Sequence, residues 1–329
     1  MKKVIVTGAA GFIGYHLSEA LLAKNYTVVG VDCISSYYDI RIKNKRLALL
    51  KKYKTFKFIK IDIANYKKLE SLIKKEKPDE IVHLAAQAGV RYSLVNPWAY
   101  ADANYLGTMN VFEAAKRLKM SRVIYASSSS VYGANEKQPF SEEDRTDRPI
   151  SLYGATKRAN ELLAHSYNHL YGMEMVGLRF FTVYGPWSRP DMALFKFAKR
   201  ILRGDAIDLY NNGEMRRSFT YVGDVAEGIA QLLDMPSTGR NLIYNIGGAE
   251  AVPLVRFVEL IEKELGKTSK RNLLPLQSGD VPETLADCAL AERDFGYKPK
   301  VSIEEGISIF AKWLRDNETF ALALKEPKQ

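Results

Sequence analysis

Three glycines at a fixed spacing near the N-terminus constrain the fold of this chain most. The apolar run at residues 3–7 leads directly into Gly8, Gly11 and Gly14, and an apolar-periodic stretch follows at residues 12–23. Glycines between a strand and a helix let the backbone approach a pyrophosphate, which then rests on the helix N-terminus. A glycine triplet alone is weak evidence, because glycines also end strands for steric reasons. The arrangement predicts a strand, a turn and a helix that bind a dinucleotide.

Short β-branched runs alternate with longer helical patterns from residue 3 to about residue 180. This alternation predicts an α/β fold with a doubly wound parallel sheet. The expected strands cover residues 3–7, 27–31, 56–61, 80–84, 122–127 and 174–179, with helical patterns such as 12–23 and 100–118 between them.

After residue 180 prolines punctuate shorter segments, which is typical of a smaller, loop-rich domain. We expect residues 1–179 to form an NAD-binding domain of the Rossmann type. Residues 180–329 should form a smaller mixed α/β domain. That domain is discontinuous, because the helical period at 219–234 predicts a segment around 215–245 that returns to the first domain. The tail at 319–329 is expected to fray.

The composition excludes several classes of protein. The chain has 329 residues, of which 47% are hydrophobic and 26% charged, enough for one large or two closely packed domains. Cys33 and Cys288 suggest neither a disulfide framework nor a metal site, so a cytoplasmic protein is expected. No apolar run is long enough for a membrane span. The net charge of +10, densest from Lys43 to Lys60, lacks a nucleic-acid motif and suits small anionic substrates.

Asp32 is expected to select the cofactor. It stands eighteen residues after Gly14, where a carboxylate accepts hydrogen bonds from the adenosine ribose and repels a 2′-phosphate. This favours NAD over NADP, although Arg41 and Lys43 lie nearby, and an ordinary turn residue is the alternative. The expected cofactor-binding residues are Gly8, Gly11, Phe12, Ile13, Gly14, Asp32, Lys43, Asp62, Ile63, Leu84, Ala85, Ala86, Gln87, Tyr153, Lys157 and Phe180.

A tyrosine and a lysine four residues apart form the candidate catalytic pair. Tyr153 and Lys157 share one helical face, where the ammonium and a bound nicotinamide cation would favour the phenolate. A serine at the end of the preceding strand can hydrogen-bond the substrate oxygen from which the tyrosine would take a proton, with Ser128 preferred and Ser129 next. The alternatives are a core-edge tyrosine, a solvated lysine and a serine turn cluster.

Taken together, these motifs resemble the extended short-chain dehydrogenase/reductases that act on nucleotide sugars. The matching segments are Gly8 to Gly14, Asp32, 83–86, 128–133, Tyr153 to Lys157, 179–185 and 217–221. The resemblance implies a UDP-sugar substrate, a tightly bound NAD that is regenerated in each turnover, and a homodimer. It also implies diphosphate contacts from Arg217, a place near the nucleotide for Asp280, and a role in polysaccharide biosynthesis.

Within this family, two segments resemble UDP-glucuronate 4-epimerases: residues 87–91 and 181–193. UDP-glucuronate decarboxylases carry a glutamate where Ser130 stands, and elimination chemistry would need such an acid or base. Thr182 and Arg189 provide a hydroxyl and a guanidinium for a C6 carboxylate, with Arg91 as a weaker candidate. Arg189 could instead form a structural salt bridge. Ser188 departs from the family, which commonly has glycine there.

The expected reaction is 4-epimerisation of UDP-glucuronate to UDP-galacturonate through a transient 4-keto sugar, with Tyr153 as the base. Three alternatives stay open: epimerisation of UDP-glucose and UDP-galactose, decarboxylation of UDP-glucuronate, and a non-catalytic NAD-binding regulator. No metal is expected, because His165 and His169 have no third ligand in view. No nucleic acid and no membrane are expected as partners.

Overall fold

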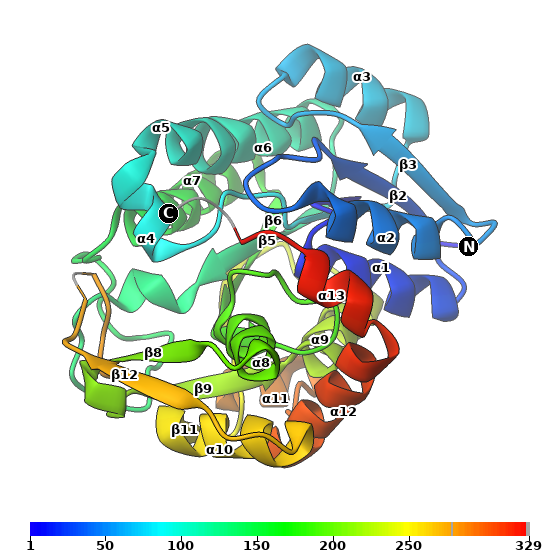
Figure 1. The fold of residues 1–329 in the computed structure, drawn as a ribbon. Helices are drawn as coiled ribbons and strands as arrows, with labels where there is room; N and C mark the ends of the chain where they lie inside the picture. Colours follow the sequence, from blue (N-terminus) through cyan, green and yellow to red (C-terminus); the bar gives the residue numbers. More distant parts are fainter. Residues whose placement is uncertain (278, 327–329) are drawn as a thin grey trace.

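The computed structural model describes residues 1–277 and 279–326 and is built around a seven-stranded sheet (Figure 1). All neighbouring strands are parallel, in the order β10-β6-β5-β4-β1-β2-β3. The expected α/β class is therefore confirmed, and each of the six expected strands is found to within one residue. The strands are β1 (Lys3–Thr7), β2 (Thr27–Asp32), β3 (Phe56–Lys60), β4 (Glu80–His83), β5 (Arg122–Ser128), β6 (Glu174–Phe180) and β10 (Asn241–Ile246).

Helices cover both faces of this sheet (Figure 1). Val4 and Val6 of β1 pack into the core under one set of helices, and Ile5 packs into the core on the opposite face. Strands buried on both faces lack a polar side, as the unbroken apolar runs predict. The first core contains α1 (Phe12–Ala23) and α9 (Val222–Asp234), and the second contains α3 (Tyr66–Glu76), α6 (Gly107–Arg117) and α7 (Leu152–Tyr171).

The chain reverses its direction of winding at β1. From β1 it proceeds to β2 and β3 on one side of the sheet, and from β3 it crosses to β4 on the other side. In open parallel sheets, ligands bind at this switch point, outside the carboxyl ends of the strands. The loops after β1 and β4 are therefore where a cofactor is expected.

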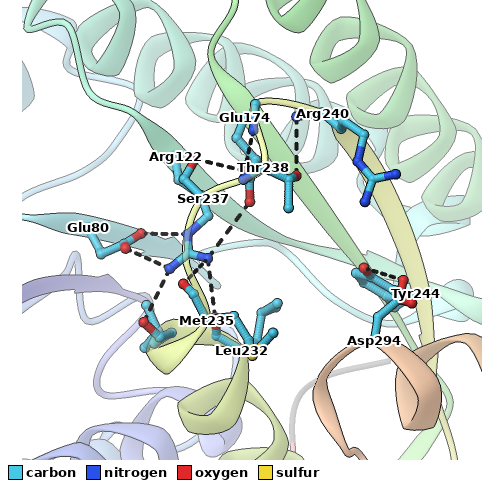
Figure 2. A network of polar contacts seen from close by, with 12 residues as sticks. Glu80, Arg122, Glu174, Leu232, Met235, Ser237, Thr238, Arg240, Tyr244 and Asp294 are labelled. Atoms are coloured by element: carbon cyan, nitrogen blue, oxygen red, sulfur yellow. Dashed lines mark hydrogen bonds and ion pairs between the residues drawn. The ribbon is translucent and has the colours of Figure 1, made fainter.

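A buried ion-pair network at the amino ends of the strands attaches the segment before β10 to the sheet (Figure 2). The Arg122 guanidinium makes a two-point contact with Glu80, at 2.7 and 3.0 Å, and lies 3.8 Å from Glu174. It also donates to the Met235 carbonyl over 3.1 Å, while Glu174 accepts from the Ser237 hydroxyl over 2.7 Å. The network joins the starts of β4, β5 and β6 to the turn between α9 and β10.

The rest of the chain forms smaller sheets covered by helices. Strand β9 (Arg216–Tyr221) is central, with β7, β11 and β13 paired to it, and β8 pairs with β12. Phe219 stacks on Phe257 with ring centroids 4.0 Å apart, inside a core separate from those of the large sheet. The other elements are β7 (Thr182–Tyr184), β8 (Ala206–Tyr210), β11 (Ala251–Pro253), β12 (Lys270–Leu274), β13 (Glu283–Thr284), α8 (Ala193–Arg203), α10 (Leu254–Leu265), α11 (Ala289–Phe295) and α12 (Ile303–Asp316).

The helix expected over residues 100–118 is interrupted. Helix α5 (Pro97–Tyr100) passes into a π-helical segment, Ala101–Leu106, before α6 begins at Gly107. A Cβ on Gly107 would lie 2.6 Å from Ile63, so the glycine allows close packing at the junction. A π-helical turn shifts the side chains by part of a turn and often marks a functional site. Here it buries Asn104.

Two further expectations were wrong in part. Residues 219–221 belong to strand β9, so the helix expected over 219–234 starts at Val222. The tail forms helix α13 (Glu318–Ala323), whose last carbonyls accept hydrogen bonds from Arg41 and Arg203 at 2.6 Å each. Cations at a helix C-terminus oppose the negative end of its dipole, which favours the helix at residues 318–323. Residues 327–329 lie outside the described residues.

Positive charge is concentrated at one edge of the large sheet. Residues 43–77 hold thirteen Lys and Arg and three Asp and Glu, so this stretch alone has a charge of +10, equal to that of the whole chain. The stretch includes most of α2 (Ile40–Leu50), the edge strand β3 and helix α3. Eleven of its lysines are exposed. None of the helices searched, which cover the described residues, is long and apolar enough to cross a bilayer.

Candidate active site

The glycine loop after β1 is packed so closely that a side chain at Gly8 or Gly14 would collide with the protein backbone. Gly8 has φ +73, and a Cβ there would lie 2.8 Å from the Ala85 nitrogen, while a Cβ on Gly14 would lie 2.1 Å from the Gly8 oxygen. Helix α1 starts after Gly11 with no side-chain cap, so its first N–H groups remain available to an anion. Phe12 opens the helix. The loop thus fits the pyrophosphate of NAD.

Asp32 lies at the end of β2 beside this loop. Its carboxylate accepts hydrogen bonds from the backbone nitrogens of Ala10, over 3.1 Å, and Ile34, over 2.7 Å. The side chain is therefore fixed in place with lone pairs left for ribose hydroxyls. Lys43 donates to the Ser35 carbonyl over 2.8 Å, in the loop that follows β2. Arg41, the other nearby cation, pairs with Asp39 instead.

The loop after β4 is held by buried polar residues. The His83 ring lies 2.7 Å from the Thr7 hydroxyl, and burial lowers the pKa of His83 to about 3, so the ring stays neutral. Residues 84–86 are half-buried. Gln87 is fixed by Asn104, which accepts from the Gln87 nitrogen over 2.8 Å and donates to its carbonyl over 3.0 Å. Sequence reasoning missed Asn104, since it lies within an ordinary helical pattern.

Two other expected cofactor residues follow β3. Ile63 is buried and packs on Gly107, whereas the Asp62 side chain is exposed and accepts from the Ala64 nitrogen over 2.9 Å. The Ile63 carbonyl accepts from Asn110 over 2.9 Å. These contacts keep the loop close to the carboxyl edge of the sheet.

Arg46 is a second residue that sequence reasoning missed. Its guanidinium is fully buried and donates to the Ala10 carbonyl in the glycine loop over 2.8 Å. It also donates to the Trp187 carbonyl, over 3.1 Å from Nε. Arg46 therefore couples the cofactor loop to the segment that carries Arg189. Nothing in a lysine-rich helix distinguishes one buried arginine from its exposed neighbours.

The candidate catalytic helix begins close to β5. Ser151 caps α7 by accepting from the Gly154 nitrogen over 3.0 Å, which places Tyr153 in the first turn. Lys157 is buried one turn later, and its ammonium donates to the Ala126 carbonyl over 2.9 Å. The two side chains of the expected pair thus lie at the carboxyl end of β5.

Burial and two neighbouring groups act on the pKa of Tyr153 in opposite directions. Burial raises the pKa of Tyr153, whereas the Ser128 hydroxyl and the positive charge of Arg189 lower it. Burial lowers the pKa of Lys157 to about 8. In the protein alone, burial outweighs Ser128 and Arg189, so the pKa of Tyr153 stays above its ordinary value.

The serines that end β5 have different surroundings. Ser127 is turned away, since its hydroxyl donates to the Glu161 carboxylate over 2.6 Å. Ser128 accepts from the Ser130 nitrogen over 3.2 Å and lies level with Phe180 on β6. Ser129 begins a short 3-10 turn, Ser129–Tyr132. The geometry agrees with the preference for Ser128 over its neighbours.

A buried ion pair between Arg179 and Glu161 lies next to the serines that end β5. Arg179 of β6 contacts Glu161 of α7 with two parallel hydrogen bonds, at 2.9 and 3.0 Å. Although burial favours the protonated acid, the hydrogen bonds from Arg179 lower the pKa of Glu161. The carboxylate therefore stays ionised between β5, β6 and the catalytic helix. The sequence showed Arg179 only as part of a motif, and Glu161 was missed.

Arg189 is held beside Tyr153 by an acidic neighbour. Nε donates to Asp191 over 3.0 Å and Nη2 over 2.5 Å. A Cβ on Gly89 would lie 3.8 Å from Nη2 and equally far from the Tyr100 hydroxyl, and the Tyr100 ring is 6.1 Å from that of Tyr153. The structural salt bridge named above as an alternative therefore exists, and Tyr100 lies between it and the candidate base Tyr153.

Thr182, the other candidate for binding the carboxylate, and Ser188, the residue that departs from the family pattern, both precede Arg189 by a few residues. Thr182 is half-buried on β7, and its hydroxyl has no hydrogen-bond partner within residues 1–277 and 279–326. Ser188 is fully buried, and within the same residues its hydroxyl is also unpartnered. The departure from glycine thus adds a buried polar atom next to Arg189.

A second cationic cluster gathers around Asp280. Its carboxylate lies 3.4 Å from Arg217 and 3.6 Å from Arg91, and the Arg91 guanidinium covers the Tyr210 ring at 4.2 Å. The structure therefore places Arg91 with the expected diphosphate residues and not at the Asp191 pair. Two arginines around one carboxylate suit a diphosphate, which can make two-point contacts with each.

The fold, the glycine loop and the Tyr153/Lys157 pair define a nicotinamide-dependent enzyme with a Rossmann domain. A model of the NAD dependent epimerase/dehydratase family matches residues 4–247, from β1 to the end of β10. The chain belongs to this family, and NAD is its cofactor.

Similar proteins extend over nearly the whole chain. A probable UDP-glucuronate 4-epimerase of Rhizobium meliloti is 45% identical, covering 96% of this chain and 97% of its own. An uncharacterized protein of Methanocaldococcus jannaschii is 52% identical, covering 98% and 99%. The crystal structure of UDP-glucuronic acid 4-epimerase from Bacillus cereus with UDP-glucuronic acid and NAD has a TM-score of 0.90 and 35% identity, covering 95% and 99%.

Proposed function

We propose that this protein is a UDP-glucuronate 4-epimerase that interconverts UDP-glucuronate and UDP-galacturonate with bound NAD. The observation that carries the proposal is the place of Arg189, whose guanidinium lies with the Tyr100 hydroxyl around Gly89, while the Tyr100 ring is 6.1 Å from that of Tyr153. A guanidinium in this cluster suits a sugar whose C6 is a carboxylate, whereas the C6 hydroxyl of a neutral hexose would form no ion pair with it. Named relatives and the Bacillus cereus structure support the same substrate.

The proposed chemistry starts at the C4 hydroxyl of the sugar. Tyr153 takes its proton while Ser128 donates a hydrogen bond to the same oxygen, which stabilises the developing negative charge. Bound NAD accepts the C4 hydride and later returns it, so the reaction has no net redox change. After the 4-keto sugar has rotated so that the opposite face of C4 meets the cofactor, the hydride returns. Tyr153 then gives its proton back to the C4 oxygen, which completes the epimer.

The residues that would hold NAD follow from the fitted site. Gly8, Gly11 and Gly14 admit the pyrophosphate, with Phe12 and Ile13 at the helix start, and Asp32 receives the ribose hydroxyls. The remaining proposed contacts come from Lys43, Asp62, Ile63, Leu84, Ala85, Ala86, Gln87, Tyr153, Lys157 and Phe180. For the substrate, Arg91 and Arg217 would contact the diphosphate, Asp280 would lie near the nucleotide, and Thr182 and Arg189 would receive the carboxylate.

The same residues must prevent a side reaction. A 4-keto uronate is a β-keto acid, which loses carbon dioxide when the carboxylate bond stands perpendicular to the carbonyl plane. Thr182 and Arg189 would hold the carboxylate out of that orientation. In the Thr182→Val variant, the fraction of UDP-pentose by-product should rise severalfold, and an unchanged fraction would contradict this role.

The deciding experiment incubates purified protein with UDP-glucuronate without added NAD and separates the products. UDP-galacturonate is the expected product and would show that NAD is retained. UDP-xylose or a 4-keto pentose would make the protein a decarboxylase. Conversion of UDP-glucose to UDP-galactose, with no turnover of UDP-glucuronate, would remove the carboxylate site. No turnover of any sugar, with NAD bound, would favour a regulator.

We also propose the division into a cofactor domain, residues 1–179 with a returning segment around 215–245, and a UDP-sugar domain in 180–329. The end of α9 and the entry to β10 attach the returning segment to the large sheet. The proposed homodimer forms through neighbouring helices α5 and α7, where Trp98, Leu162 and Leu170 are 76%, 55% and 65% exposed. Sedimentation velocity of Leu162→Glu should then show monomers.

The proposed location is the cytoplasm, where nucleotide sugars for polysaccharide biosynthesis would be supplied. Both cysteines are free thiols, and a reducing compartment would keep them so. Detection of the activity in the cytosolic fraction of the source cells is the corresponding test, and its recovery with secreted protein would contradict it.

A further inference from the structure

The Arg189 guanidinium has two edges that can bind a carboxylate, and only one is in use. Asp191 occupies the edge formed by Nε and Nη2. Among residues 1–277 and 279–326, no acceptor lies within hydrogen-bonding distance of Nη1. A second carboxylate can therefore approach end-on, through Nη1 and Nη2, while Asp191 remains in place.

The guanidinium is fixed by more than this ion pair. The rings of Tyr37 and Tyr38 lie 5.7 and 5.9 Å from its central carbon, and the Tyr37 hydroxyl is 3.4 Å from the Asp191 carboxylate. Both side chains of the ion pair are only 17% exposed. Although burial opposes charge, Asp191 raises the pKa of Arg189. Arg189 is thus a permanent cation whose charge is already matched by a resident anion.

The proposed reaction places an unusual demand on this cation. Hydride leaves one face of C4 and must return to the other, so the sugar ring turns over within the site. The C6 carboxylate is attached to the neighbouring ring carbon and cannot keep its position during that turn. Arg189 must hold the carboxylate firmly enough to prevent decarboxylation, yet release it once in every turnover.

We propose that Asp191 is the residue that makes this release possible, by competing with the substrate carboxylate for Arg189. The inference rests on the proposed function. With Asp191 ionised, the carboxylate of the substrate meets a guanidinium that is already neutralised, so its attraction is weaker than for a free cation. When the sugar turns, Arg189 retains its partner and no buried charge is left unpaired. Asp191 is a positioning residue that sets the strength of the grip.

The test is the Asp191→Asn variant, which keeps the shape and removes the charge. Competition predicts that KM for UDP-glucuronate falls about three- to tenfold and that kcat also falls severalfold, because the carboxylate is held through the turn. A purely structural role predicts the reverse for KM, since a loosened Arg189 binds substrate less well. A raised KM, or kinetics unchanged in both parameters, would overturn the proposal.

Matched variants separate the possible explanations. Arg145 and Asp147 form an ion pair with the same Arg-x-Asp spacing at 3.3 Å, exposed at 81% and 52%, so Asp147→Asn should leave both parameters unchanged. Asp191→Glu keeps the charge and should keep KM near that of the parent. If Asp191→Asn does not fold, Asp191→Ser removes the same charge and is measured instead.

The failure of this inference differs from the failure of the proposed function. If the parent protein does not convert UDP-glucuronate, the proposed function itself is wrong. If the parent is active and Asp191→Asn has a raised KM, the epimerase stands and only the competition is rejected. Titration calorimetry of UDP-glucuronate with NAD-loaded protein should show the same tightening in Asp191→Asn, independently of turnover.

Discussion

The hydroxyl of Ser127 donates to the Glu161 carboxylate over 2.6 Å and so joins β5 to the catalytic helix α7. The contact lies between the two elements that supply Ser128 and Tyr153. On the same carboxylate, Arg179 adds two hydrogen bonds from β6. The distance between the candidate base and its serine partner is therefore set by a buried charge that touches neither of them.

Replacing that charge should weaken the whole protein. In Glu161→Gln, the buried Arg179 loses its counter-charge, and we expect the free energy of unfolding to fall by about 3–5 kcal/mol. Denaturant titration followed by circular dichroism measures the change. Glu227→Gln, which breaks a half-exposed pair with Lys24 at 2.8 Å, is the control and should change stability by less than about 1 kcal/mol. An equal loss of unfolding free energy in both variants would show that Glu161 contributes no more to stability than an exposed ion pair.

Tyr153→Phe should abolish turnover without disturbing the cofactor. Loss of a positioned acid–base group lowers kcat by about 10²–10⁴. Because the phenyl ring can keep its contact with Tyr100, the bound NAD, released by denaturation and measured by chromatography, should stay equal to that of the parent. Residual activity above a tenth of the parent's would point to another base.

Lys157 should make stability depend on pH in a defined direction. Its pKa in the folded protein, about 8, lies below the ordinary value of 10.5, so the folded state loses the proton first. The cost of burying the charge, about 3 kcal/mol, is present in full below pH 8 and disappears between pH 8 and 10.5. Relative to Lys157→Met, the parent should therefore gain Tm as the pH rises from 7.5 to 10. A difference in Tm that is constant over this range would contradict the shift.

Asp32 should determine both the amount and the kind of cofactor bound. In Asp32→Ala the carboxylate that faces the ribose is lost, and affinity for NAD should fall about tenfold or more. Affinity for NADP should fall much less or increase, because the repulsion of the 2′-phosphate is gone. Fluorescence titration of cofactor-free protein with both reduced dinucleotides gives the ratio, and an unchanged ratio would mean that another residue selects NAD.

The local motifs of the cofactor site could be predicted from the sequence, since each depends on residues close together in the chain. Gly8 to Gly14, Asp32 and the strand boundaries follow from spacing and periodicity, and the structure places them as expected. Tyr153 and Lys157 also lie as expected on one helix. In these cases the covalent chain itself fixes the geometry.

Contacts between distant segments could not be predicted. Arg91 was expected to lie with Arg189, but it pairs with Asp280, which also binds Arg217. Arg91 and Asp280 are almost 190 residues apart in the sequence. Asn104 acts through a π-helical segment that has no sequence signature. The role of a buried polar residue depends on its partners, and a single sequence does not reveal which segments meet.

The lysines around β3 affect how two copies of this protein approach one another at that edge of the sheet. β3 is one of the two edge strands of the large sheet, and its free edge offers unpaired backbone groups to a strand from another molecule. Lys57 and Lys60 are exposed on this strand, and helix α3 beside it carries four more exposed lysines, at positions 67, 68, 74 and 75. Two such borders approaching one another would bring like charges together, which guards the unpaired backbone against fibre-like stacking. A crowded solution of this protein should therefore tolerate high concentration at low salt, and high salt should weaken that protection first along β3.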